Sequence, residues 1–211
     1  MSAKHPYLLG LVAALLVVSC ETPQAICDQA QQLYDARDYA AALPLYRKSA
    51  DKGNAQARYM LAKCYDFGYG TRKDIKEAVR WYRSAAELGH VDAQNNLATC
   101  YFSGAGVPEN MQQAVFWYSR AAEQGDASAY NNLGLHYLNG QGVAKDLAKA
   151  ASLFAVAAQL DDANGQYNLG KCYDMGLGVQ QDPQQAEHWI RKAAAQGQRN
   201  AALFMQDKGW Q

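Results

Sequence analysis

The amino-acid sequence repeats at an interval of 36 residues, and no other feature restricts the possible folds as strongly. The leucines in step are Leu61, Leu97, Leu133 and Leu169. The paired glycines in step are Gly68/Gly70, Gly104/Gly106, Gly140/Gly142 and Gly176/Gly178. Because self-similarity with a period of about 20–50 residues marks repeat architectures, we expect an array of similar units.

Each unit contains two stretches in which apolar or small residues lie on one helical stripe. Ala129, Leu133 and Tyr137 form such a stripe in a first stretch, and Ala114 and Tyr118 begin one in a second stretch. This spacing is typical of an α-helix. Small alanines let packed helices approach closely. The sequence therefore predicts an all-α fold built from helical hairpins.

The segment between the two stretches contains G-x-G, as in YLNGQGVAKD from Tyr137 to Asp146, which superficially resembles a phosphate-binding loop. A phosphate loop follows a strand and needs a third glycine or a Gly-Lys-Ser/Thr ending. Here the segment occurs four times, always after a predicted helix. Gly140 is placed to end that helix in the left-handed conformation, and Gly142 permits a second sharp turn. We therefore expect a turn and no nucleotide site.

An acidic or amide residue precedes each second helix, where it can cap the free N–H groups. These residues are Asp74, Asn110, Asp146 and Asp182. Glu77, Gln113 and Gln185 follow three residues after three of them, which is the spacing of a capping box.

The repeating pattern A-x-x-x-L-G/A-x-x-Y-x-x-G-x-G-V-x-x-D-x-x-x-A-x-x-W-Y-x-x-A-A-x-x-G resembles the Sel1-like repeat, a relative of the tetratricopeptide repeat. The resemblance implies a right-handed α/α solenoid of helical hairpins. It covers residues 54–89, 90–125, 126–161 and 162–197. Residues 26–53 resemble a tetratricopeptide unit with a shorter loop. Residues 198–211 are expected to form a C-terminal capping helix, because a solenoid must cover its last apolar face.

The first 19 residues have the pattern of a secretory signal. Lys4 precedes an apolar run from Tyr7 to Val18, which is shorter than the about 20 residues that cross a bilayer and fits the core of a signal peptide. The run ends in V-V-S-C, which resembles the lipobox of bacterial lipoproteins. That resemblance implies cleavage before Cys20 and acylation of Cys20.

Acylation would place the protein on a membrane, because each buried CH₂ of an acyl chain contributes about 0.8 kcal/mol. Residues 20–25 are expected to form a short tether. The expected location is the periplasmic face of the cell envelope, and Glu21 after the cysteine favours the outer membrane. Lysine plus arginine and aspartate plus glutamate number 20 each, so there is no basic excess to favour nucleic acid.

The cysteines predict neither disulfides nor a metal site. Cys64, Cys100 and Cys172 share one repeat position, which His136 occupies in the third unit. Equivalent helices of neighbouring repeats lie about 10 Å apart. A disulfide needs Cα atoms within about 7 Å, and zinc needs ligand atoms at about 2.0–2.3 Å. We therefore interpret these residues as a column of small core residues and, with Cys27, predict four free thiols and no cofactor.

The sequence contains one weak sign of catalysis. Ser49-Ala50-Asp51-Lys52 matches S-x-x-K, the nucleophile motif of penicillin-recognising enzymes, but neither S-D-N nor K-T-G accompanies it. A cysteine-rich branch of Sel1 proteins has been linked to penicillin binding and β-lactamase activity. That branch forms disulfides within a repeat, and no unit here has the second cysteine. The histidines His90, His136 and His188 lack a nearby nucleophile, so we interpret them as structural.

The first helices carry the candidate binding residues, because in the related tetratricopeptide fold these helices line a concave, peptide-binding groove. Carried over by position, the groove residues are Tyr59, Met60, Lys63, Asn95, Asn96, Thr99, Asn131, Asn132, Leu135, Tyr167, Asn168 and Lys171. Asparagine is a poor helix former, yet Asn96, Asn132 and Asn168 recur at mid-helix. They either hydrogen-bond an extended partner or bond within the scaffold. Trp81, Trp117 and Trp189 lie on second helices and are interpreted as packing between repeats.

The expected function is that of a lipid-anchored scaffold that binds a protein or peptide in its groove at the bacterial cell envelope. An enzyme acting on penicillins or cell-wall material is one alternative. A secreted factor that recognises a host protein, with Cys20 not acylated, is another. Neither nucleic acid nor nucleotide is an expected partner.

Overall fold

The computed structural model describes residues 21–210, and this part of the chain consists of eleven α-helices joined by short turns. The predicted signal peptide (1–19) and Cys20 lie outside the described residues. The helices are α1 (Pro23–Asp35), α2 (Tyr39–Asp51), α3 (Ala55–Phe67), α4 (Ile75–Glu87), α5 (Val91–Ser103), α6 (Met111–Glu123), α7 (Ala127–Asn139), α8 (Leu147–Gln159), α9 (Ala163–Met175), α10 (Pro183–Ala195) and α11 (Arg199–Lys208). No helix in residues 21–210 is long and apolar enough to cross a bilayer.

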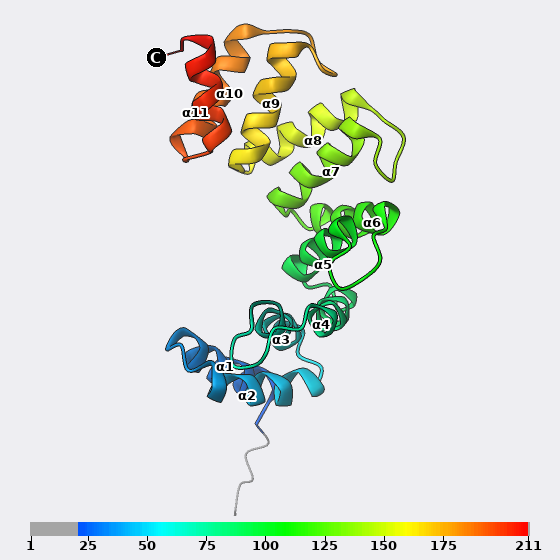
Figure 1. Ribbon diagram of the computed structural model, residues 1–211, viewed down its shortest axis with the longest axis vertical. Helices are drawn as coiled ribbons and strands as arrows, with labels where there is room; N and C mark the ends of the chain where they lie inside the picture. Colours follow the sequence, from blue (N-terminus) through cyan, green and yellow to red (C-terminus); the bar gives the residue numbers. More distant parts are fainter. Residues whose placement is uncertain (1–20, 211) are drawn as a thin grey trace, which may run out of the picture.

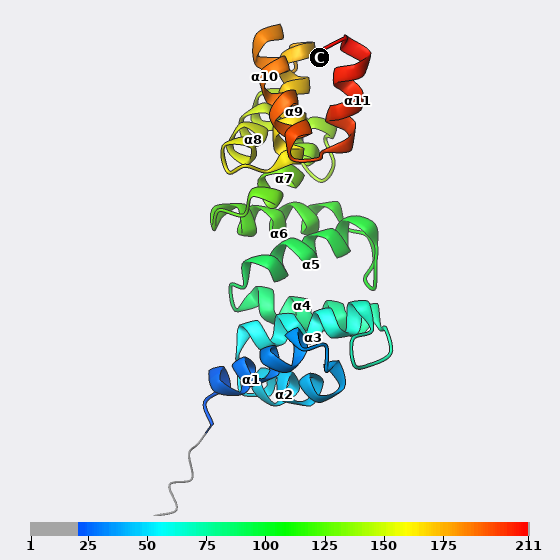
Figure 2. The same cartoon turned by 90° about the vertical axis from the view of Figure 1, so that its left-hand side faces the viewer.

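The helices pair into five hairpins that stack along the long axis of the molecule, and α11 ends the stack (Figure 1). Within each hairpin the two helices contact each other along their length, and the second helix also packs on the first helix of the next hairpin. The stack bows, with α3 and α5 on its inner side and α4 and α6 on its outer side. Figure 2 shows the same succession from the side. The predicted all-helical solenoid with a C-terminal helix is confirmed.

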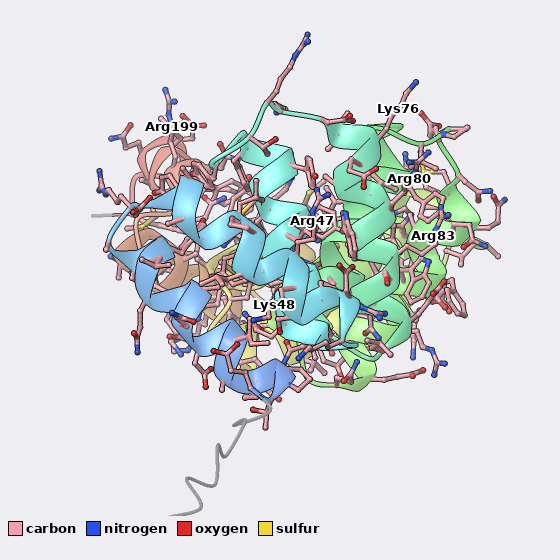
Figure 3. All side chains as sticks on the ribbon, turned by 90° about the horizontal axis from the view of Figure 1, so that it is seen from below. Arg47, Lys48, Lys76, Arg80, Arg83 and Arg199 are labelled. Atoms are coloured by element: carbon pink, nitrogen blue, oxygen red, sulfur yellow. The ribbon has the colours of Figure 1, made fainter. Side chains whose placement is uncertain are left out.

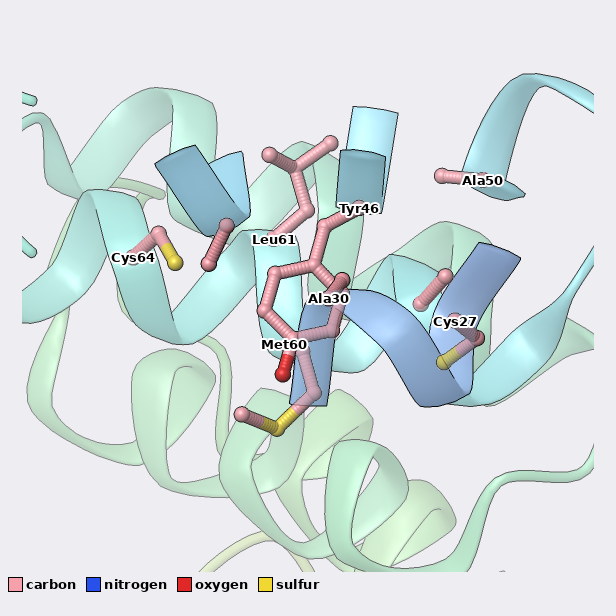
Figure 4. Packing of buried hydrophobic residues seen from close by; sticks show 9 residues of the cluster. Cys27, Ala30, Tyr46, Ala50, Met60, Leu61 and Cys64 are labelled. Atoms are coloured by element: carbon pink, nitrogen blue, oxygen red, sulfur yellow. The ribbon is translucent and has the colours of Figure 1, made fainter. Parts of the chain in front are cut away.

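The core is a series of small clusters along the stack rather than one large interior. In the first cluster, Tyr46 of α2 packs with Ala30 of α1 and Leu61 of α3, and each is fully buried (Figure 4). The alanines Ala78, Ala114, Ala150 and Ala186 are also fully buried. Because alanine adds only a methyl group, the helices approach closely, and one large residue from each second helix fills the remaining space.

The glycine turns have a second role that concerns the contact between repeats. Gly140 ends α7 in the left-handed conformation, and its N–H donates to the carbonyl of His136. Gly142 also has a positive φ, and a Cβ added there would lie 2.5 Å from the carbonyl oxygen of Met111 in the preceding hairpin. The loop therefore packs directly on the start of α6, where no larger residue fits.

The capping prediction was right for the caps but wrong for the capping boxes. The carboxylate of Asp74 accepts the N–H groups of Lys76 and Glu77, as expected of a cap. The backbone N–H of Asp74 donates to the carbonyl of Tyr65 at 2.8 Å. Glu77 instead accepts from Arg80 and Trp81. Because the loop folds back on the preceding helix, the N–H that a capping box would satisfy already has an acceptor.

The chain also becomes helical earlier than the sequence suggested. Residues 20–25 were predicted to be a tether, yet α1 begins at Pro23. Thr22 caps this helix by accepting the N–H of Ala25, and Pro23 takes the first helical position, where its missing N–H costs nothing.

We expect Gly142→Ala to destabilise the fold more than Gly125→Ala. Both glycines have positive φ, +74° and +89°, so alanine costs about 1–2 kcal/mol at either position. Only at Gly142 does the new Cβ meet backbone, whereas nothing lies within 4 Å at Gly125. That clash adds about 1–3 kcal/mol. Urea unfolding followed by circular dichroism measures both variants, and equal midpoints would contradict the steric role of the loop.

Candidate binding face

The inner helices α3, α5, α7 and α9 carry the predicted groove residues at three repeat positions, which together we call the inner face. Most of these side chains are half-buried, and Thr99 is exposed. Met60 is only 4% exposed and belongs to the core cluster of Tyr46 and Leu61. Asn131 is 5% exposed. Met60 and Asn131 are therefore packed inside the scaffold and do not face an open groove. Tyr46 of α2 packs near Met60, and Asn168 of α9 contacts Asn131.

Three hydrogen bonds join four inner-face asparagines into a chain that crosses from α9 to α5, which we call the amide chain. The Nδ2 of Asn168 donates to Oδ1 of Asn131 at 2.8 Å. Asn131 donates to Asn132 at 3.4 Å, and Asn132 donates to Asn95 at 3.5 Å. The amide nitrogens of Asn168, Asn131 and Asn132 each carry two N–H groups and use one of them here, whereas Asn95 only accepts. Asn131 is buried, so its role is within the scaffold, whereas Asn132 and Asn168 are half-buried and each keep a second N–H. For these two residues a scaffold role is compatible with hydrogen bonds to a partner.

The inner face has a tyrosine–lysine pair at each end. Lys63 Nζ lies 5.6 Å from the ring centre of Tyr59, and Lys171 Nζ lies 5.7 Å from that of Tyr167. Such cation–π contacts hold the ammonium groups over the rings. His90 stacks on Tyr59 at 4.4 Å, and burial lowers the pKa of this histidine. The pair formed by Tyr59 and Lys63 therefore recurs three repeats later as Tyr167 and Lys171. In the two repeats between these pairs, the position of the tyrosine is occupied by an asparagine.

Two depressions open between successive inner helices. The first depression, about 220 Å³, is lined by Asp66, Phe67, Ile75, Tyr82, Asn96, Thr99, Cys100, Ser103 and Ala105. The second depression, about 110 Å³, is lined by Phe102, Tyr118, Asn132, Leu135, His136, Asn139 and Gln141. Most of their residues correspond at an interval of 36, as Asn96 does to Asn132. The two depressions are therefore one feature of the repeat, built twice.

The chemistry of the two depressions differs. In the first, Asp66 presents a carboxylate whose Oδ2 accepts from the hydroxyl of Tyr82 at 3.1 Å. In the second, Phe102 takes the equivalent position and packs edge-on against His136 at 5.5 Å. His136 Nδ1 lies 2.8 Å from the carbonyl of Gln141, and burial lowers the pKa of its ring. The first depression is therefore acidic, and the second is neutral and mainly apolar at physiological pH.

Sequence reasoning missed the residues that give these depressions their character. Asp66 and Phe102 occupy the position two residues before the first loop glycine, with Leu138 and Asp174 in the other units. The leucine, tyrosine and glycine registers around this position are constant, whereas the position itself changes from acidic to apolar. This change of residue type, at a position between a tyrosine and a glycine that are the same in every repeat, was the sequence signal that could have identified Asp66 and Phe102.

Many of the cationic side chains lie on the outer helices, away from the inner face. Figure 3 shows Arg47 and Lys48 on α2 and Lys76, Arg80 and Arg83 on α4. Arg83 donates to the hydroxyl of Tyr101 at 2.9 Å, and Arg47 makes the equivalent contact with the hydroxyl of Tyr65. Arg47 connects α2 to α3 and Arg83 connects α4 to α5, so these two arginines contribute to the stacking of the first three hairpins.

The indole rings pack where the sequence suggested. Trp81 packs against both the first and the second core cluster, and Trp117 packs against the second and the third. Trp189 packs on the fourth cluster. This arrangement supports their interpretation as contacts between repeats.

The cysteines lie in the core. Cys27, Cys64, Cys100 and Cys172 are buried free thiols in the described residues. Burial raises the pKa of each to about 11. Within residues 21–210, no group of histidines, cysteines and carboxylates is arranged to hold a metal ion.

Ser49 of the S-x-x-K motif is also inaccessible. Its side chain is fully buried, and its hydroxyl donates to the carbonyl of Pro23. Lys52 Nζ donates to the carbonyl of Glu21 at 3.2 Å. A nucleophile must reach its substrate with a base beside it, and this serine instead joins α2 to the start of α1.

The family model of the Sel1 repeat matches five segments of the chain, residues 33–54, 55–90, 91–126, 127–162 and 163–198. The chain belongs to the Sel1 repeat family. The first matched segment, residues 33–54, begins inside the unit 26–53 that the sequence suggested to be tetratricopeptide-like, and it ends one residue after that unit. No curated protein matches the chain.

Solved structures agree with this assignment. A Sel1 repeat protein from Oxalobacter formigenes is 37% identical, with a TM-score of 0.80 over 86% of this chain and 76% of its own. A protective antigen of uropathogenic Escherichia coli, c5321, is 34% identical, with a TM-score of 0.81 over 89% of this chain and 42% of its own. The Helicobacter pylori cysteine-rich protein B is 31% identical, with a TM-score of 0.51 over 63% of this chain and 95% of its own.

We expect the four core thiols of the Sel1 repeats and of the first hairpin to react only when the fold opens. With a pKa of about 11, roughly one thiol in a thousand is ionised at pH 8, and the thiolate is the reactive form. Ellman's reagent applied to a Cys20→Ser variant should therefore react slowly in buffer and label four thiols in denaturant. Rapid labelling without denaturant would show that the cysteine column is open to solvent.

Proposed function

We propose that this Sel1 repeat protein is a lipid-anchored scaffold of the bacterial cell envelope that binds a protein or peptide segment along its inner face. The observation that carries this proposal is the row of half-buried polar and aromatic side chains on α3, α5, α7 and α9, hollowed by two depressions in register. Ligand pockets commonly combine a few placed polar groups with apolar walls.

The inner face offers what an extended chain needs. An extended segment leaves its backbone N–H and C=O groups without internal partners. The amide chain supplies N–H donors across three helices, and Ser103 and Asn139 are exposed at the edges of the depressions. Because hydrogen bonds hold the amide-chain side chains in place, their use in binding costs little side-chain entropy.

The start of the solenoid suits attachment close to a membrane. Glu21 contacts Lys48 at 2.7 Å, and the carbonyl of Glu21 accepts from Lys52. The scaffold therefore begins directly after Cys20, the residue that the lipobox pattern marks for acylation. In this arrangement the first hairpin would lie against the bilayer, and the inner face would extend away from it.

Within residues 21–210, no structural feature favours either of the two alternative functions. A penicillin-directed hydrolase would need an accessible nucleophile, and Ser49 is buried with its hydroxyl bound to Pro23. A secreted host-binding factor would share the same fold and inner face. The chemistry of the mature N-terminus separates that factor from the lipid-anchored scaffold.

We expect a photo-crosslinking amino acid at Ser103 to capture the partner in intact cells. Ser103 is exposed at the first depression, so a segment bound there lies within reach of the probe. The matched control places the same amino acid at Arg80, an exposed position on the outer helix α4 (Figure 3). Capture only from Arg80 would move the binding site to the outer surface.

We expect Cys20→Ser to release the protein from membranes. Intact-mass spectrometry of the wild-type mature protein should show an N-terminal cysteine carrying acyl chains, and the variant should fractionate with soluble proteins. Wild-type protein without acyl groups, recovered outside the cells, would instead support the secreted alternative. This result concerns location only, so it leaves the crosslinking experiment informative.

A further inference from the structure

We propose that a cationic surface at the start of the solenoid binds the anionic headgroups of the bilayer to which the protein is anchored. This surface, which we call the basic end, consists of Arg47, Lys48, Lys52, Arg72, Lys73 and Lys76. The inference rests on the membrane attachment in the proposed function and adds a second, electrostatic contact to it.

The basic end begins one residue after the predicted acylation site. One peptide bond joins Glu21 to Cys20, so Glu21 cannot move far from an acyl group attached there. The carboxylate of Glu21 pairs with Lys48 Nζ at 2.7 Å, and the carbonyl of Glu21 accepts from Lys52 Nζ at 3.2 Å. Both lysines are exposed. Acylation of Cys20 would therefore bring these two cations to the headgroup layer.

Contacts between helices continue the basic end from α2 to the loop between α3 and α4. Arg47, next to Lys48 on α2, donates to the hydroxyl of Tyr65. Tyr65 in turn lines an open hollow of about 500 Å³, and the same hollow is lined by Arg72, Lys73 and Lys76. The six cations therefore belong to one continuous surface of the first two hairpins.

This surface extends along α2. The α3–α4 loop packs on the start of α2, because a Cβ added at Gly70 would meet the carbonyl of Tyr39. Glu21 contacts Lys48, nine residues further along α2, and a helix rises about 1.5 Å per residue, so the two contacts lie roughly 14 Å apart. Figure 2 shows α2 across the lower end of the stack, with the start of the described chain at the left and the α3–α4 loop at the right. A bilayer bound at both ends of α2 would therefore lie along this helix, and the stack would point away from it.

The chain itself neutralises these cations poorly. Within residues 21–210, Arg72 and Lys76 are exposed and take part in no ion pair. Lys73 Nζ lies 3.9 Å from the carboxylate of Asp66, and the lysine side chain is 66% exposed. Such exposed ion pairs contribute little. Lipid phosphates can therefore take the place of the carboxylates.

The positive charge is concentrated near the anchor. Residues 21–89 contain 11 lysines and arginines and 9 acidic residues, whereas residues 90–210 contain 8 and 11. The positions of Arg72, Lys73 and Lys76 are occupied in the second Sel1 repeat by Pro108, Glu109 and Gln112, and in the fourth by Gln180, Gln181 and Gln184. The loop has the same fold in these repeats, so its structure does not require the cations.

The composition of the surface fits a bilayer better than an acidic protein. The exposed residues of α2 include Ala40, Pro44 and the charged side chains, but no large apolar residue. Protein interfaces depend on large side chains that fill pockets at their centre. Contact with anionic headgroups needs only cations close to the surface, each of which strengthens binding roughly fivefold.

The experiment uses the mature chain with Cys20→Ser, which carries no acyl group, and two kinds of vesicle. One kind contains phosphatidylcholine alone, and the other contains an equimolar mixture of phosphatidylcholine and phosphatidylglycerol. Cosedimentation measures the bound fraction. At low ionic strength we expect binding to the anionic vesicles to be about tenfold stronger or more, and added salt should reduce this difference by screening the charges. Equal binding to both kinds of vesicle would overturn the inference.

The third Sel1 repeat supplies a matched control for total charge. Lys73→Gln with Lys76→Gln removes two cations from the basic end, and Lys145→Gln with Lys149→Gln removes two from the same region of the third repeat. Lys145 has the repeat position of Lys73, and all four lysines are exposed. The first pair should weaken binding to anionic vesicles about tenfold or more, and the second should leave it nearly unchanged.

Circular dichroism confirms that both variants remain folded. An equal loss of binding from the two pairs would show that net charge, rather than the basic end, governs the interaction, and would contradict the inference.

The failures of the two proposals are distinguishable. If Cys20 carries acyl chains and the acyl-free chain shows no preference for anionic vesicles, the anchoring stands and the role of the basic end is wrong. If Cys20 carries no acyl chain, the lipid anchor of the proposed function is wrong. A vesicle preference that depends on Lys73 and Lys76 would still identify the basic end as a membrane-binding surface in that case.

Discussion

The structure depends on the close approach of each glycine loop to the second helix of the preceding hairpin. A Cβ at Gly106 would lie 2.6 Å from the carbonyl oxygen of Ile75, and one at Gly178 would lie 2.0 Å from that of Leu147. Buried alanines permit the same closeness between the helices themselves. Because protein interiors are close-packed, a larger residue at these loop positions would push consecutive hairpins apart. The spacing of every feature along the stack follows from these contacts.

Because consecutive repeats are spaced equally, the side chains at equivalent positions can differ while the backbone keeps the same shape. Asp66 and Phe102 occupy equivalent places, as do Cys100 and His136. Their backbones are positioned by the same caps and turns, so only the side chains differ. Stability in such solenoids comes from each repeat and its neighbours. A substitution on the inner face therefore affects the ligand more than the fold, whereas a substitution at a loop glycine affects both.

Local features were the most predictable from sequence. The caps at Asp74 and Asn110 and the left-handed glycine at Gly140 were foreseen, because each depends on a few consecutive residues. The capping box at Glu77 was not formed, because Tyr65, from the preceding helix, already accepts the N–H of Asp74. Met60 was expected in the groove and lies in the core, where Tyr46 of the preceding helix packs near it. Each discrepancy arises from a contact that the repeat pattern does not encode.

The sequence by itself determined the helices, their turns and their stacking, because the 36-residue period repeats one local geometry. Only the tertiary structure decided which inner-face residues are open to a partner. The side chain of Asn131 is buried and hydrogen-bonds with Asn168 and Asn132, whereas Thr99, at another inner-face position, is exposed. Exposure depends on side chains contributed by neighbouring helices, and their identities change between repeats while the backbone does not. The pairing of an acidic with an apolar depression was therefore visible only after the hairpins were stacked.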